Sequence, residues 1–79
     1  LGLSNNQIKN IPREIGNLKN LELLMLSNNP IDDLPNEIIE INDLIIDVID
    51  CRVGQKTVER LSKLANKDLS KMIFIEDPN

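Results

Sequence analysis

The sequence is nearly without aromatic residues and contains no histidine. Phe74 is the single aromatic residue among 79, and Trp and Tyr are absent. The interior must therefore be built from Leu, Ile and Val, whose similar volumes suit a stack of equivalent layers. The one cysteine, Cys51, cannot form an internal disulfide, and it has no histidine or second cysteine with which to share a metal ion. We expect neither a metal nor a cofactor.

Positive charge is scarce as well. Nine Lys and Arg residues stand against 13 Asp and Glu residues, which gives a formal net charge of -4. A nucleic-acid interface needs basic residues clustered on one face, with aromatic residues between them. The longest basic cluster here, Lys63 with Lys67 and Lys71, is diluted by acidic residues. We therefore expect no nucleic-acid partner.

Long apolar runs are also missing. Leu44-Ile45-Ile46 is interrupted by Asp47, and no run approaches the roughly 20 residues that a membrane-spanning helix requires. We expect no membrane span. The single cysteine and the absence of an Asn-x-Ser/Thr glycosylation sequon favour a cytoplasmic location.

The sequence does contain an internal repeat. Residues 1–8, Leu-Gly-Leu-Ser-Asn-Asn-Gln-Ile, match residues 24–31, Leu-Met-Leu-Ser-Asn-Asn-Pro-Ile, at a spacing of 23. The match continues from Ile11-Pro12 to Leu34-Pro35. A period of about 20 to 29 residues with regularly placed Leu and Asn is typical of leucine-rich repeats, in which stacked units form a solenoid.

The repeat extends further along the chain if its spacing changes. A spacing of 22 keeps Asp47 out of the core, and a spacing of 26 then carries the pattern to the end of the sequence. The equivalent positions become Leu24, Ile46 and Met72; Leu26, Val48 and Phe74; and Asn29, Cys51 and Asp77. We expect one domain over residues 1–79, with repeats at about 1–23, 24–45 and 46–71 and a partial repeat at 72–79. Because residue 1 already lies within a repeat, we expect a fragment of a longer array.

Each repeat should contribute one short parallel strand. The expected strands are residues 1–4, 24–27, 46–49 and 72–75, side by side on the concave face of a right-handed, horseshoe-shaped solenoid. On the convex side, Pro12 and Pro35 precede segments long enough for only a turn or so of 3₁₀ or α-helix, with proline at the first helical position.

The convex segment of the third repeat has a different pattern. No proline occurs between Val53 and Lys67, and apolar residues recur there at spacings of three and four, the helical period. These residues are Val58, Leu61, Leu64 and Ala65. We therefore expect an α/β fold with one true amphipathic helix, which ends near Asn66 in a left-handed backbone conformation.

The asparagine of the repeat motif predicts a ladder of structural side chains. It lies where the chain leaves the strand, and its amide can both donate and accept hydrogen bonds to the neighbouring turn. The ladder positions are Asn6, Asn29, Cys51 and Asp77. Cys51 can donate a weak hydrogen bond but cannot reproduce the two-way bonding of an amide, and we expect an inert, structural thiol.

No group of residues predicts catalysis. Acidic residues that could be imagined as paired carboxylates or a calcium loop are Asp32 with Asp33, Glu37 with Glu40, and Asp43 with Asp47 and Asp50. None has the alternating ligand pattern around a glycine that a calcium loop requires, and we expect solvated surface charges. Nucleophile elbows and Gly-rich phosphate loops are absent too. We expect no catalytic residues and no enzyme activity.

The concave face is the candidate binding site. Because side chains alternate along a strand, the residues between the inward positions should point away from the core. The candidate partner-binding residues are Leu23, Met25, Ser27, Ile45, Asp47, Ile49, Lys71, Ile73 and Ile75. Apolar residues grouped on an exposed sheet indicate an interface. The alternatives are an incorrect register, or a helix and tail that fold over this face.

The segment Leu-x-Leu-Ser-x-Asn-x-Ile-x-x-Ile/Leu-Pro-x-Glu-Ile, with Gly-Asn-Leu-Lys-Asn-Leu after Ile15, resembles the intracellular, Ras-suppressor-like class of leucine-rich repeat proteins. The resemblance covers residues 1 to 44, and the third repeat departs from it. It implies a horseshoe whose concave face binds protein partners, as in scaffold proteins and in signalling kinases and GTPases that carry such repeats.

The resemblance leaves three functions open. The first is a noncatalytic module that binds an unidentified protein partner on its concave face. The second is the regulatory or sensor region of a larger signalling enzyme such as a kinase, GTPase or ubiquitin ligase. The third is a structural end segment whose apolar face is covered by neighbouring repeats or by self-association. A fold shared by many functions does not choose among them.

Overall fold

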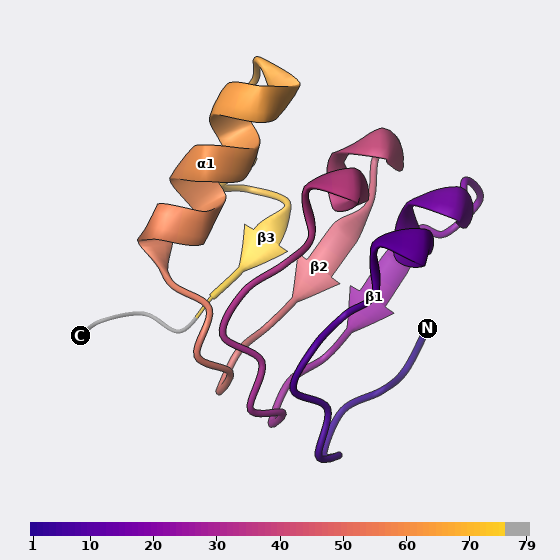
Figure 1. Cartoon of the computed structure of the whole chain (residues 1–79), viewed down its shortest axis with the longest axis vertical. Helices are drawn as coiled ribbons and strands as arrows, with labels where there is room; N and C mark the ends of the chain where they lie inside the picture. Colours follow the sequence, from indigo (N-terminus) through magenta and orange to yellow (C-terminus); the bar gives the residue numbers. More distant parts are fainter. Residues whose placement is uncertain (76–79) are drawn as a thin grey trace.

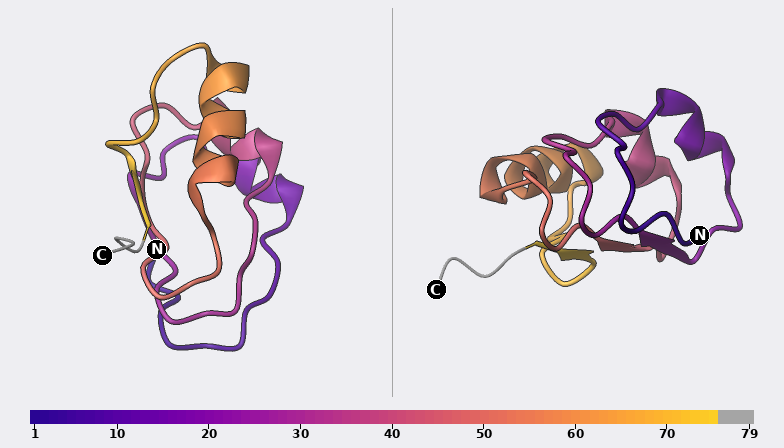
Figure 2. Two further views of the ribbon diagram at one scale, coloured as in Figure 1. Left: turned by 90° about the vertical axis from the view of Figure 1, so that its left-hand side faces the viewer. Right: turned by 90° about the horizontal axis from the view of Figure 1, so that it is seen from below.

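The computed structural model of the chain describes residues 1–75, which form two layers around an aliphatic core. One layer is a parallel sheet of strands β1 (Leu23–Met25), β2 (Ile45–Asp47) and β3 (Ile73–Phe74), in the order β1-β2-β3. The other holds the 3₁₀ helices η1 (Arg13–Asn17) and η2 (Asn36–Glu40) and the α-helix α1 (Gln55–Ala65). Figure 1 shows these elements in sequence order across the molecule, and Figure 2 shows strands on one side and helical segments on the other.

Residues 1–4, predicted to be the first strand, form only an isolated bridge and a few backbone hydrogen bonds along the edge of β1. Gly2 forms an isolated parallel bridge with Met25. The Leu3 N–H donates to the Met25 carbonyl at 2.8 Å, and the Asn5 N–H donates to the Ser27 carbonyl at 2.9 Å. Residue 2 therefore lies opposite residue 25, which confirms the spacing of 23 between the first two repeats.

The second spacing is confirmed and the third is wrong by one residue. Leu24 lies opposite Ile46, a spacing of 22, whereas Ile46 lies opposite Ile73 rather than Met72. The extra residue is taken up in the turn that follows the buried Leu69. The Leu69 carbonyl accepts hydrogen bonds from the N–H groups of both Met72 (3.0 Å) and Ile73 (3.1 Å), which closes this turn before β3 begins.

The two proline-led segments are 3₁₀ helices that begin one residue later than expected. Pro12 and Pro35 have extended backbones, with ψ of 151° and 149°, and each lies immediately before its helix. The Pro12 carbonyl accepts the Ile15 N–H at 3.1 Å, and the Pro35 carbonyl accepts the Ile38 N–H at 3.1 Å. Proline therefore precedes the first helical residue instead of occupying that position.

Helix α1 confirms the predicted helix and its end. Asn66 has φ 55° and ψ 39°, and its N–H donates to the last turn, which is the left-handed termination expected of Asn. Val58 and Leu61 are buried, but Leu64 is 51% exposed. At 3.6 residues per turn, Leu64 lies about 60° around the helix from Leu61, outside the stripe that faces the core.

The core is aliphatic and follows the repeat. Its fully buried side chains are Leu24, Leu26, Ile31, Leu34, Val48 and Leu61. The expected inward positions Ile46 and Val53 are also buried, at 4% and 6% exposure. The spacing of 22 therefore does place Asp47 on the other side of the sheet from the core.

The helical layer depends on one close backbone approach. Helix η1 packs against η2 at Gly16, which is buried. A Cβ atom added to Gly16 would lie 2.7 Å from the Glu37 carbonyl oxygen and 2.9 Å from the Glu37 Cβ. Since both neighbours belong to η2 itself, only a shift of the two helices could make room.

We expect Gly16→Ala to destabilise the protein by about 1–3 kcal/mol, the usual cost of overpacking a well-packed site. Chemical denaturation of the variant and the wild type measures the difference. Gly2→Ala is the matched control, because a Cβ at Gly2 has no heavy atom within 4 Å and its effect should stay within about 0.5 kcal/mol. Equal stability of the two variants would contradict the close packing of η1 on η2.

Candidate functional site

Five large apolar side chains stand exposed on the side of the sheet that faces away from the core. They are Leu23 (42% exposed), Met25 (39%), Ile45 (42%), Ile49 (42%) and Phe74 (45%). The residues between them on each strand, such as Leu24 and Ile46, are buried, as strand alternation requires. We call these five residues, together with Asp47, the exposed sheet face.

The structure corrects two members of the predicted face. Ile73 is buried at 3% exposure, and Ile75 is partly buried against the core. The reason is the one-residue error in the third spacing, because a slip of one residue moves every side chain of a strand to the opposite side. Phe74, which the sequence pattern placed inward, is the residue of β3 that belongs to the exposed sheet face.

Two polar members of the predicted face lie at its margins. Ser27 is half-buried, and its hydroxyl donates to the Ser4 hydroxyl at 2.9 Å, which links the first two repeats. Lys71 is exposed in the turn before β3. Neither residue is in a strand, so Asp47 is the one polar side chain among the strand residues of the exposed sheet face.

Asp47 is the acidic residue of the exposed sheet face. It lies on β2, opposite Met25 on β1 and Phe74 on β3. Its side chain is half-buried, and Oδ1 accepts the Ile49 N–H at 3.1 Å. This bond fixes the carboxylate at the end of β2, where the chain leaves the sheet.

Asn29 forms the predicted bridge between neighbouring turns. Its side chain is 2% exposed, and its Oδ1 accepts the N–H groups of Asn6 and Ile8, both at 3.1 Å. Its Nδ2 donates to the carbonyls of Leu3 at 2.9 Å and Leu26 at 2.8 Å. The amide therefore satisfies backbone groups of two turns at once.

Cys51 occupies the equivalent position in the third turn and makes the single donor bond that the sequence predicts for it. Its thiol donates to the Leu26 carbonyl at 3.0 Å, as Asn29 does to Leu3 one turn earlier. Burial raises the pKa of the thiol, the Asn29 backbone N–H lowers it, and Asp47 and Asp50 raise it, with a net pKa above its ordinary value. The thiol is therefore a donor to the second turn, and its raised pKa favours the protonated form that donates.

The other two ladder positions contribute less. Asn6 is exposed, and its Nδ2 donates only to the nearby carbonyls of Leu3 (2.9 Å) and Ser4 (3.1 Å) among residues 1–75. Asp77 lies outside the described residues.

A left-handed backbone conformation also recurs along the chain, and it is not among the features predicted from the sequence. Asn5, Asn28 and Asp50 all have left-handed backbones, with φ of 61°, 58° and 59°, and each directly precedes a ladder residue. Asn and Asp tolerate this conformation better than other side chains except Gly. The recurrence of Asn or Asp before the ladder position was the signal that could have predicted it.

Asp33, one of the acidic residues expected to be solvated, is exposed and also attaches α1 to the second turn. The Asp33 carboxylate accepts hydrogen bonds from Arg60 Nη1 at 2.9 and 3.1 Å and from the Thr57 hydroxyl at 3.0 Å. Arg60 also donates to the Asn36 Oδ1 at 3.0 Å and to the Leu34 carbonyl at 2.6 Å. Partial burial raises the pKa of Asp33, but the bonds from Arg60, the Leu34 N–H and Thr57 outweigh it and lower that pKa.

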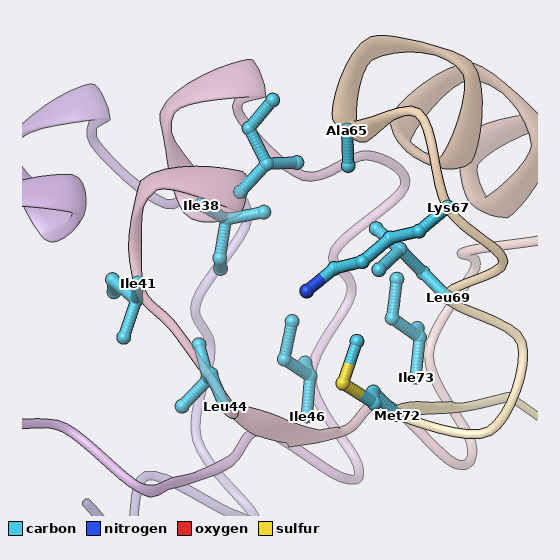
Figure 3. A pocket seen from close by; sticks show the side chains of 10 residues that line it. Ile38, Ile41, Leu44, Ile46, Ala65, Lys67, Leu69, Met72 and Ile73 are labelled. Carbon is cyan, nitrogen blue, oxygen red and sulfur yellow. The ribbon is translucent and has the colours of Figure 1, made fainter.

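A small apolar pocket lies between η2, β2 and the turn before β3 (Figure 3). Its lining includes Ile38, Leu44, Ile46 and Met72, and the Lys67 side chain extends across it with its nitrogen directed toward this lining. Its volume is about 20 Å³, room for about one water molecule. The pocket therefore marks where the longer third turn packs less closely on the second.

Residues 1–75 contain no group of three or more His, Cys, Asp or Glu side chains placed to hold a metal ion. In the same part of the chain, no helix is long and apolar enough to cross a membrane. The exposed sheet face is accordingly the feature of these residues that most resembles a binding site.

We expect Asn29→Ala to destabilise the protein by roughly 2–4 kcal/mol, because several buried backbone groups lose their partners and each orphaned group costs about 1–3 kcal/mol. Urea denaturation followed by circular dichroism gives the value. Asn6→Ala is the control, and its cost should be clearly smaller because Asn6 is exposed. A similar loss in both variants would argue against the bridging role of Asn29.

We expect the stabilising effect of Asp33 to depend on pH. Since its folded pKa lies below the unfolded value of about 3.9, its contribution is present above pH 4 or so and is lost as the pH falls through the folded pKa. With both side chains of the pair substantially exposed, the contribution should be about 1 kcal/mol or less. Denaturation of wild type and Asp33→Asn at pH 7 and pH 2.5 measures it. The difference between the free energies of unfolding of the wild type and Asp33→Asn should be smaller at pH 2.5 than at pH 7. The control is Asp32→Asn, a substitution of the exposed neighbouring residue, and it should show no such trend.

Comparison of the chain with protein-family models gave no match, and comparison with curated proteins gave none either.

Proposed function

We propose that the chain is a segment of a right-handed leucine-rich-repeat solenoid whose concave strand face binds a protein partner. Three observations support the solenoid. Parallel strands recur at spacings of 22 and 27 residues, and helical segments return on the opposite layer. The buried Asn29 side chain and the partly buried Cys51 side chain each bridge one turn to the turn before it. These are the features of stacked, equivalent turns.

The observation that carries the binding function is the exposed sheet face. Its five apolar side chains come from β1, β2 and β3 and from the residues that follow β2, so they form one surface instead of isolated positions. Contiguous exposed apolar surface of this kind marks interaction sites in soluble proteins. The aromatic residue and the methionine within it, Phe74 and Met25, are types enriched at protein interfaces.

A noncatalytic role fits the chemistry of this face. Its side chains are apolar apart from Asp47, and the sequence holds no histidine to act as a base. Cys51 lies in the ladder and has a raised pKa, the opposite of what a nucleophilic thiol requires. The face therefore offers shape and apolar area to a partner.

We expect Met25→Asp and Ile49→Asp to leave the fold intact and to weaken partner binding by about tenfold or more, the loss typical of a central interface residue. Pull-down with each variant as bait, quantified against wild type for the protein that the wild type retains, measures the loss. Circular dichroism of each bait checks the fold.

Leu64→Asp is the matched control for this experiment. It makes the same change from an apolar to a charged side chain at an exposed position, but on α1 in the opposite layer. It should retain the partner at the wild-type level. Equal losses for Leu64→Asp and the two face variants, or unfolding of Met25→Asp, would overturn the proposed site.

A further inference from the structure

The exposed sheet face has a carboxylate at its centre, surrounded by apolar side chains in four directions. Asp47 is flanked along its own strand by Ile45 and Ile49, two residues before and after it. Across the sheet it lies between Met25 and Phe74. Neighbouring strands are about 4.8 Å apart, so these side chains are direct neighbours of the Asp47 carboxylate.

The charge of Asp47 is not neutralised within the described residues. The ion pairs of residues 1–75 join Arg13 to Glu14 and Arg60 to Asp33, and neither involves Asp47. In the same part of the chain, the hydrogen bond recorded for its side chain is the one from the Ile49 N–H to Oδ1. Within residues 1–75, no hydrogen bond to the second carboxylate oxygen, Oδ2, is recorded, so this oxygen has the capacity to accept one from a partner.

This arrangement restricts what can cover the face. A partner that packs on Met25, Ile45, Ile49 and Phe74 must also cover the carboxylate in their midst. Burial of an unpaired carboxylate is strongly unfavourable, whereas burial of one that meets a cation is tolerated. An apolar partner surface without a positive charge, or one with an acid at this point, is therefore rejected.

We propose that the exposed sheet face recognises an arginine side chain of a protein partner, held between apolar partner residues, with Asp47 as its counter-ion. The inference rests on the proposed partner-binding function and specifies the chemistry of the partner. Arginine suits the position better than lysine because its planar guanidinium can bond a carboxylate and stack on an aromatic ring at the same time. Asp47 supplies the carboxylate, and Phe74, its neighbour in the sheet, supplies the ring.

The shift of β3 by one residue is what completes this site. If Ile73 faced outward, as the repeat pattern alone suggests, the neighbour of Asp47 would be aliphatic. With Phe74 in that place, the single aromatic residue of the chain lies beside the acid at the centre of its exposed apolar surface.

A library of random 12-residue peptides displayed on phage and selected against the immobilised protein tests the proposal. The selected peptides should be enriched in arginine flanked by apolar residues. One such peptide is then synthesised together with a copy in which citrulline, a neutral analogue of the same shape, replaces the arginine. We expect the citrulline peptide to bind wild type about tenfold or more weakly, as for other close charge pairs across interfaces.

Variants of the protein then locate the effect. Asp47→Asn should lose about the same factor for the arginine peptide and should no longer distinguish it from the citrulline peptide, and Phe74→Leu should show a smaller loss. Asp32→Asn removes the same charge at an exposed position outside the sheet and should behave as wild type.

Three outcomes would count against the inference. Selected peptides without a basic residue, or a preference for arginine that persists in Asp47→Asn, would overturn it while leaving the partner-binding function standing. Recovery of no peptide that binds above background would overturn both.

Discussion

Backbone groups that leave the parallel strands need hydrogen-bond partners, and the whole structure depends on how they are provided. At residues 3–8 and 26–29 the chain turns away from the sheet, and pairing with a neighbouring strand no longer supplies hydrogen bonds to its backbone N–H and C=O groups. The buried amide of Asn29 supplies four of these bonds and joins two turns. The strands are only two or three residues long, so this side-chain bridge, and the thiol of Cys51 after it, fixes one turn against the next.

The two layers of the structure differ in the contacts that they make. The helical layer holds the molecule together, through the close contact at Gly16 and through the Arg60 bonds that connect α1 to residues 33–36. Within residues 1–75, no such contacts are recorded on the outer side of the sheet, where apolar residues surround Asp47. The partner that we propose for this surface would pack on the apolar residues and bring a positive charge to Asp47.

The sequence predicts the repeated parts of this fold well, because repetition shows which positions are equivalent. The first two spacings, the ladder role of Asn29 and the end of α1 at Asn66 follow from residue types and their periods. The third spacing could not be obtained in this way, since it depends on a turn after Leu69 that has no counterpart in the earlier repeats. The hydrogen bonds between Asp33 and Arg60 could not be predicted from the sequence either. They join residues 27 positions apart, and both side chains belong to types that are usually surface charges.

The turn between Leu69 and Ile73 also determines what kind of surface the protein presents. Side chains alternate along a strand, so an odd change in the number of residues before β3 exchanges its inner and outer sets, whereas an even change preserves them. A variant of this chain could thus replace a buried Ile and an exposed Phe by the reverse pair without any substitution, through a single-residue insertion or deletion. A change in loop length, which costs little in stability, can in this way change the chemistry of a sheet surface formed by residues outside the loop.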